Sequence, residues 1–234
     1  MSHPTPGPDT DTHTDGAPPL LRTRALAGSR GERRLFEGLD LSLRPGEVVW
    51  LRGRNGRGKT TLLRLLAGLS TPAAGTIELQ GQPLQQAAAE GRRRLCYVAH
   101  ANALKDDLSA TEALRFLARI GGTRPGDDEL ERALARLGVA SRASAAVRTL
   151  SQGQRRRVAL ARLALPGAPP LWLLDEPFDA LDDRGIEVLN DLLAAHARAG
   201  GATLLTSHQA LSLREPVPRE LRLDVYAPRA GGRG

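Results

Sequence analysis

The chain has 234 residues, of which 41% are hydrophobic and only 3% aromatic, and its formal net charge at pH 7 is +7. This length allows one large domain or two small ones, with a core of aliphatic side chains. The basic excess indicates a polyanionic partner such as a nucleotide, a nucleic acid or a membrane surface, although a general bias toward arginine explains most of it. No aromatic residues are interleaved with the arginines, which argues against nucleic-acid binding.

The first 20 residues are rich in proline and acidic side chains, and we expect a disordered tail over residues 1–20. A secretory signal would need basic and apolar segments there. No apolar run approaches the roughly 18 residues of a membrane-spanning helix. The single cysteine, Cys96, excludes an internal disulfide and suits a reducing compartment. The sequence predicts a chain that is soluble on its own and contacts a membrane through partners only.

Residues 21–45 predict paired short strands, because apolar and polar side chains alternate, most clearly in 39–43. Pro45 and Gly46 give a turn signal. The apolar run at 47–51 then predicts a short buried strand.

A glycine-rich stretch follows this strand and leads into a helical pattern at 61–67. It fits the spacing G-x-x-x-x-G-K-[ST], in which backbone N–H groups and a helix N-terminus surround a phosphate chain. We expect the lysine to reach the β- and γ-phosphates and the first threonine to bind Mg²⁺. An ordinary glycine turn is the alternative, which the flanking strand and helix disfavour. The predicted nucleotide-binding residues are Gly53, Arg54, Asn55, Gly56, Arg57, Gly58, Lys59, Thr60 and Thr61.

The remaining chain alternates between strand-like and helix-like segments. Residues from about 104 to 146 have a helical pattern and predict an all-helical insertion. Strands that alternate with helices around a phosphate-binding loop imply an α/β fold with a mainly parallel sheet, covered on both faces. The further strands are predicted at 75–79, 95–98, 172–174 and 203–206.

An apolar strand that ends in Asp175 and Glu176 is the second functional element. Two carboxylates at this strand end would lie beside the phosphate-binding loop. Asp175 suits the Mg²⁺ shell, and Glu176 suits the general base that activates a water. Solvated acids at a strand end are the alternative, which the loop upstream disfavours.

A Ser-Gly turn that opens a helix is the third element, and its sequence is Leu-Ser-Gln-Gly-Gln at 150–154. Such a turn is a second anion site. Because one nucleotide rarely needs two such sites in one chain, we expect a head-to-tail dimer in which the turn covers the γ-phosphate on the partner's loop. The arginines at 155–157 are expected to form a solvated helix face.

In this order, and followed by a later histidine, these elements resemble the ATP-binding cassette (ABC) ATPases. The resemblance implies an ABC-type P-loop ATPase domain over residues 21–226, with an antiparallel β subdomain, a helical subdomain at about 101–150 and a flexible tail at 227–234. It implies ATP and Mg²⁺ as cofactors, with Ser151 and Gly153 on the γ-phosphate in trans. The implied catalytic residues are Glu176, His208 and Lys59, the metal ligands Thr60 and Asp175, and the signature residues Ser151, Gln152, Gly153 and Gln154.

Three features depart from the usual pattern of that family. Gln152 replaces a glycine or alanine, and its side chain can point away. His100 replaces a glutamine, where it can still contact a water or the metal, and we include it among the nucleotide-binding residues. No aromatic residue at 25–35 can stack on adenine, so Arg30 or Arg33 is expected to take that place.

The stretches at 97–112 and 171–178 resemble the haem-exporter type of ATPase in cytochrome c maturation. This resemblance implies a subunit bound peripherally to integral membrane subunits, at the cytoplasmic face of the bacterial inner membrane. Hydrolysis would serve haem export or the release of a haem-loaded chaperone, and residues 100–117 would belong to the docking surface. The alternative is an ATPase of another bacterial exporter. A nucleic-acid-acting ABC protein would carry two cassettes or a coiled-coil insertion, and an adenylate-kinase-like enzyme would lack the signature turn.

Overall fold

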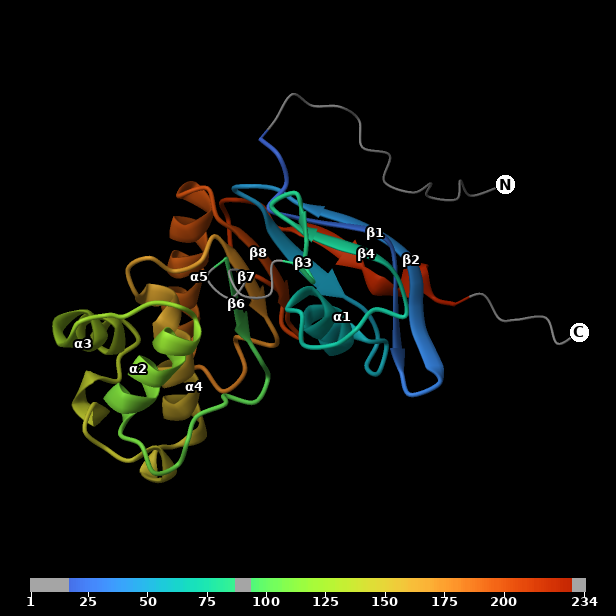
Figure 1. Cartoon of the computed structure of the whole chain (residues 1–234). Coiled ribbons are helices and arrows are strands. Elements are labelled where there is room, and N and C mark those ends of the chain that lie inside the picture. The colour runs from blue at the N-terminus through green and yellow to red at the C-terminus, as the bar shows by residue number, and fades with distance from the viewer. Residues whose placement is uncertain (1–16, 87–93, 229–234) are drawn as a thin grey trace, which may run out of the picture.

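The computed structural model describes residues 17–86 and 94–228, which form two sheets and the helices packed around them (Figure 1). The predicted tail at 1–20 lies outside the described residues up to position 16, and the tail at 227–234 from position 229. Just before the first strand, the N–H of Leu20 donates to the carbonyl of Leu43 at 2.8 Å. Within the described ranges, no helix is both long and apolar enough to cross a membrane.

The predicted antiparallel subdomain is a four-stranded sheet in the order β2-β1-β4-β5. The first two strands are longer than predicted and are joined by a tight turn at Gly31 and Glu32. All neighbouring pairs in this sheet run antiparallel. Its strands are β1 (Leu21–Arg30), β2 (Arg33–Leu43), β4 (Ala74–Leu79) and β5 (Gln82–Pro83).

The second sheet is parallel throughout and has the order β6-β7-β8-β3-β9. Strands β7, β8 and β3 are therefore neighbours, and their carboxyl ends meet at one edge of the sheet. Strand β9 was not predicted, because its sequence Arg-Glu-Leu-Arg contains a single apolar residue, the buried Leu221. The strands are β3 (Val48–Arg52), β6 (Leu95–Val98), β7 (Leu171–Leu174), β8 (Ala202–Thr206) and β9 (Arg219–Arg222).

The inner strands divide their side chains between two cores, since successive residues of a strand point to opposite faces. In β7, Trp172 and Leu174 join one core, while Leu171 and Leu173 join the other. Double burial explains why such strands read as continuous apolar runs rather than as alternating ones.

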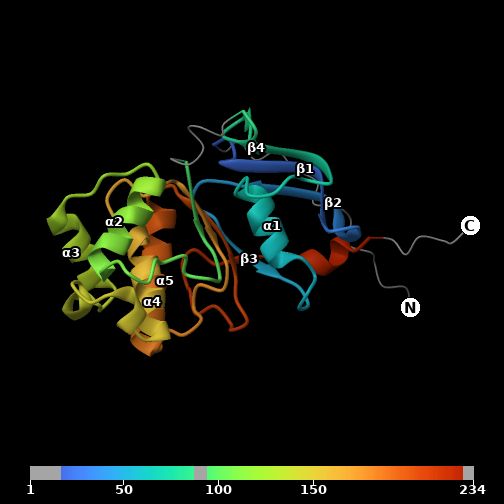
Figure 2. The ribbon, with the colours of Figure 1, turned by 60° about the horizontal axis from the view of Figure 1, so that its bottom comes forward.

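Helix α1 (Lys59–Leu66) lies between the two sheets (Figures 1 and 2). Its buried leucines share one core with strands of both sheets. Helix α5 (Asp183–Arg198) contributes Leu189, Leu192 and Leu193 to the second core, on the opposite face of the parallel sheet.

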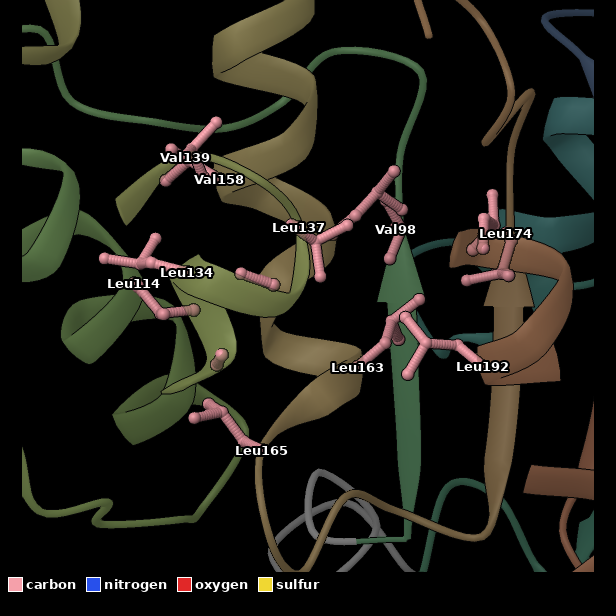
Figure 3. Packing of buried hydrophobic residues seen from close by; sticks show 14 of the residues in the cluster. Val98, Leu114, Leu134, Leu137, Val139, Val158, Leu163, Leu165, Leu174 and Leu192 are labelled. Carbon is pink, nitrogen blue, oxygen red and sulfur yellow. The ribbon is translucent and has the colours of Figure 1, made fainter. Parts of the chain in front are cut away.

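The helical subdomain consists of α2 (Ala110–Ile120), α3 (Asp127–Arg136) and α4 (Gln152–Ala161). Ser109 caps α2 in a reciprocal capping box with Glu112. Helix α4 packs on both α2 and α3, so the helical unit continues past the predicted end at 150. Figure 3 shows the core that joins these helices to the sheet, including Leu114, Leu134, Val158, Leu192, Val98 and Leu174.

Candidate active site

The loop between β3 and α1 has a backbone that glycine adopts readily and other residues rarely do. Gly53, Gly56 and Gly58 have φ angles of 159°, 74° and 106°. Gly58 is the N-cap of α1, and no side chain caps this helix. The N–H groups of its first turn are therefore available to bind an anion in the loop. A Cβ on Gly58 would also approach the side chain of Leu35 to 3.1 Å. Lys59 follows directly, and its Nζ donates to the carbonyl of Gly53 at 2.8 Å.

Asp175 stands just after β7 and is only 2% exposed. Its Oδ1 accepts a hydrogen bond from Thr206 Oγ1 at 3.0 Å, whereas its Oδ2 is buried without a hydrogen-bond partner. A buried carboxylate oxygen normally has a partner, so this orphaned atom fits a cation ligand. Within the described ranges, no cluster of three His, Cys, Asp or Glu side chains could hold a metal. A Mg²⁺ ion at Asp175 would therefore take its other ligands from Thr60, water and phosphate oxygens.

Glu176 adopts a left-handed backbone, with φ of 49°, which is unusual for a residue with a side chain. Its N–H donates to Thr206 Oγ1 at 2.8 Å, and its carboxylate accepts the backbone N–H of His208 at 3.0 Å. The ring Nε2 of His208 lies 3.5 Å from the same carboxylate, whose side chain is 9% exposed. These contacts fix the acid because β7 and β8 are neighbours in the sheet.

The sequence analysis did not identify Thr206 as a functional residue. It is the fully buried last residue of β8, and its hydroxyl binds both Asp175 and Glu176. The available signal was a threonine at the end of an apolar strand, two residues before the predicted catalytic residue His208.

A cleft of about 470 Å³ joins the predicted loop, acids and histidines. His100 lines it as well, and its exposed ring lies 3.6 Å from the carboxylate of Asp179. Arg54 and Arg57 line an adjoining cleft of about 540 Å³, while Gly53 lines neither. The 470 Å³ cleft is lined by Arg30, Arg33, Leu35, Asn55, Gly56, Gly58, Lys59, Thr60, Thr61, His100, Asp175, Glu176 and His208.

The signature turn lies apart from this cleft, since none of residues 151–154 lines it. Ser151 is the N-cap of α4: its hydroxyl accepts the Gln154 N–H at 3.2 Å, and the Gln154 side chain accepts the Ser151 N–H at 3.0 Å. Gly153 must be small, because a Cβ there would lie 2.7 Å from the carbonyl of Ala180. The two elements that the sequence predicts to bind anions, the glycine loop and the signature turn, therefore lie at separate places on one chain.

The arginines at 155–157 do not form the predicted solvated face. Arg156 is 2% exposed, and its guanidinium binds main-chain carbonyls after β7. Arg155 donates to the carbonyl of Leu150 at 3.2 Å, and Arg157 pairs with Asp182. The prediction was wrong because spacing along one helix does not show that α2, α3 and the end of β7 surround it.

The fold and this cleft define an ABC-type ATPase. The sequence pattern of the family described as "ABC transporter" matches residues 36–179, so the chain belongs to the ABC transporter family. A solved structure described as "Structure of ATP binding subunit of ABC transporter" superimposes with a TM-score of 0.73 at 29% identity, covering 81% of this chain and 79% of that one. A putative ABC transporter ATP-binding protein from Pyrococcus furiosus gives 0.76 at 25% identity, covering 89% and 99%.

Curated relatives point to one branch of that family. The "Cytochrome c biogenesis ATP-binding export protein CcmA" of Pseudomonas syringae pv. syringae is 49% identical over 213 residues, which cover 90% of this chain and 98% of the relative. The proteins of the same name from Pseudomonas savastanoi pv. phaseolicola and Dechloromonas aromatica are 47% and 45% identical. They cover 90% and 87% of this chain, and 98% and 100% of their own lengths. These matches place the chain in the CcmA branch of the ABC transporter family.

Proposed function

We propose that this chain is the ATP-binding and ATP-hydrolysing subunit of a membrane complex for cytochrome c biogenesis, where hydrolysis serves haem export or the release of a haem-loaded chaperone. The observation that carries the proposal is one cleft that brings together Lys59, Thr60, Asp175, Glu176 and His208. The printed names of the CcmA relatives support the biological setting. The second candidate is the ATPase subunit of a different bacterial exporter, and the genetic test below distinguishes the two.

The catalytic groups of the cleft divide into three sets with separate tasks in hydrolysis. The loop N–H groups and Lys59 stabilise the charge that develops on the transferred phosphoryl group. Thr60 and Asp175 would hold Mg²⁺, which supplies further positive charge beside the phosphates when it is bound. Glu176 accepts the proton of the attacking water, and the N–H of His208 holds its carboxylate in place.

We also propose that two copies of the chain assemble head to tail around two ATP molecules. The signature residues Ser151, Gln152, Gly153 and Gln154 would then contact the γ-phosphate bound to the other copy, with His100 near the attacking water or the metal. The support is geometric: the capped N-terminus of α4 lies outside the cleft of its own chain. The inner-membrane location is likewise a proposal, with contact made only through integral membrane subunits and without nucleic acid.

An apolar groove of about 690 Å³ is the surface that we propose for docking on those membrane subunits. It runs between the end of α1, the start of β6 and the end of α2. Leu69 and Ile120 both line it and are 56% and 53% exposed, so the groove is an exposed apolar patch of the kind that marks interaction sites. We assign it one occupant, an apolar surface of the membrane subunits, because the exposed side chains Leu69 and Ile120 that line it are apolar. The predicted docking range at 100–117 reaches this groove at Leu117.

The test is a strain in which the gene for this chain is deleted. We expect covalent haem attachment to periplasmic c-type cytochromes to stop while haem synthesis continues, as measured by haem staining and by total haem. A plasmid copy of the wild type should restore attachment, whereas a Lys59→Ala copy should not. Normal haem attachment in the deletion strain would move the assignment to another exporter.

A further inference from the structure

Arg156 connects two segments that carry residues of the active site. It projects from α4 into the space behind the carboxyl end of β7 and is 2% exposed. Its Nη2 donates to the carbonyls of Asp175 at 2.9 Å and Glu176 at 2.6 Å. Its Nε lies 3.4 Å from the carbonyl of Pro177. The guanidinium therefore holds the backbone that follows β7 at three consecutive residues.

The other side of the same guanidinium binds the segment that follows β6. Its Nη1 donates to the carbonyl of Ala99 at 2.9 Å and to the side-chain oxygen of Asn102 at 3.1 Å. The carbonyl of His100 lies 3.5 Å away. This segment leads from His100, which lines the cleft, toward the helical subdomain. The Arg156 side chain thus binds both the segment that follows β6 and the segment that follows β7.

Two physical features indicate that Arg156 fixes the backbone conformation of Glu176 and does not only fill space. A guanidinium is a planar fork of five N–H donors, and no other side chain can bind six oxygens on two segments at once. Glu176 also has the unusual φ of 49°, and such a conformation persists only when its surroundings fix it from several sides. Thr206 holds the N–H of Glu176, and Arg156 holds its carbonyl.

We propose that Arg156 is a positioning residue for ATP hydrolysis, which holds Glu176 in its left-handed conformation and makes that conformation depend on the 99–102 segment. Arg156 does not line the cleft, so it acts through Glu176 and not on the nucleotide. The inference rests on the proposed function and adds a route for control. A membrane subunit that moves the 99–102 segment would also move the carbonyl of the general base.

The experiment compares purified complexes carrying Arg156→Gln, Arg156→Lys or Arg132→Gln. Arg132 lies on the exposed side of α3 and is the matched control for loss of one arginine. For Arg156→Gln we expect kcat to fall about 10- to 100-fold, the effect of displacing a catalytic group slightly, with ATP affinity within about threefold of the wild type. Arg156→Lys should recover part of kcat, and Arg132→Gln should match the wild type.

A second variant, Asn102→Ala, removes one contact on the side of the 99–102 segment and leaves the contacts to Glu176. We expect it to keep the basal hydrolysis of the isolated chain but to lose stimulation by the membrane subunits. If Arg156→Gln does not fold, Arg156→Lys tests the positioning role and Asn102→Ala tests the coupling to the 99–102 segment.

The positioning role would be overturned by wild-type kcat in Arg156→Gln, or by a loss of kcat no larger than the loss of ATP affinity. Full stimulation of Asn102→Ala would overturn the coupling to the 99–102 segment. Failure of the proposed ATPase activity is distinguishable, because the wild-type complex itself would then neither bind nor hydrolyse ATP. Failure of the cytochrome c setting would appear only in the haem-attachment test and would leave these kinetic comparisons unchanged.

Discussion

At the scale of single residues, the active site depends on Thr206 as much as on the acids it binds. Its hydroxyl donates to Asp175 and accepts the N–H of Glu176, so one buried atom sets the geometry of the proposed metal ligand and of the proposed general base. Thr203 lies on the same strand and is equally buried, but its hydroxyl has no hydrogen-bond partner. Mutating each threonine therefore separates the loss of a buried hydroxyl group from the loss of the hydrogen bonds that Thr206 makes.

We expect Thr206→Val to lower both stability and kcat. Valine has nearly the same shape, but it leaves a buried N–H and a carboxylate oxygen without partners, at a cost of about 1–3 kcal/mol for each group. Urea unfolding and steady-state phosphate release measure the two effects. Thr203→Val is the control and should be neutral or stabilising, and an equal loss in both variants would contradict the assigned role of Thr206.

His196 gives a pH dependence that is separate from catalysis. Its ring stacks on Trp172 with centroids 3.7 Å apart, and burial lowers the pKa of His196 to about 4, despite hydrogen bonds with Ala202 and Pro170 that raise it. The ordinary pKa is 6.5, so the unfolded chain binds the proton more readily. The stabilisation is complete above pH 6.5 and is lost as the pH falls toward 4.

We expect His196→Phe to keep the stack and to flatten this dependence. The urea midpoint of the wild type should fall between pH 6.5 and pH 4.5 more steeply than that of the variant. Parallel curves for the two proteins would show that other groups carry the pH dependence.

At the scale of elements, the sequence was most informative where a local pattern, such as a continuous apolar run or a glycine-rich loop, indicates the element by itself. The continuous apolar runs predicted β7 and β8, and the glycine loop predicted the start of α1. Two features depended on contacts between distant segments and could not be predicted. Strand β9 has one apolar residue and pairs only because β3 offers an open edge. Arg156 is polar and adjacent to other arginines, yet the assembled carbonyls of two strand ends make its burial favourable.

The groove between α1, β6 and α2 yields a prediction about assembly. Ile120→Glu places a charge in this apolar surface and should greatly reduce co-purification with the membrane subunits, without a change in ATP affinity. Val217→Glu is the matched control, since Val217 is 80% exposed and lies outside the groove. If Ile120→Glu co-purifies as well as the control, the docking surface lies elsewhere.

At the scale of the whole molecule, the fold separates the cleft from the signature turn, which we propose to be the two halves of an ATP site. The parallel sheet brings the loop, the acids and the histidines to one edge, while the helical subdomain carries the signature turn away from them. A second copy would complete both sites at once. The same division leaves Arg156 and the 99–102 segment as the link between the halves of one chain.

We expect Glu176→Gln to accumulate as an ATP-bound dimer. The amide keeps the size of the acid but cannot accept the proton of water, and it removes a negative charge beside the γ-phosphate. Size-exclusion chromatography with light scattering, in Mg·ATP, should give a dimer with two nucleotides. The double variant Ser151→Arg, Glu176→Gln should stay monomeric, because bulk at the signature blocks the partner's site. A dimer that this double variant also forms would exclude the head-to-tail arrangement.

The most direct test of the central claim is steady-state phosphate release from Mg·ATP by the purified complex, with wild type and Lys59→Ala compared side by side. The ammonium of Lys59 is the side-chain cation that α1 places at the phosphate loop. We predict turnover by the wild type and a loss of at least about 100-fold in the variant, because a charge that stabilises the transferred phosphoryl group is gone. Equal turnover by the two proteins would contradict the assignment of this cleft as the site of ATP hydrolysis.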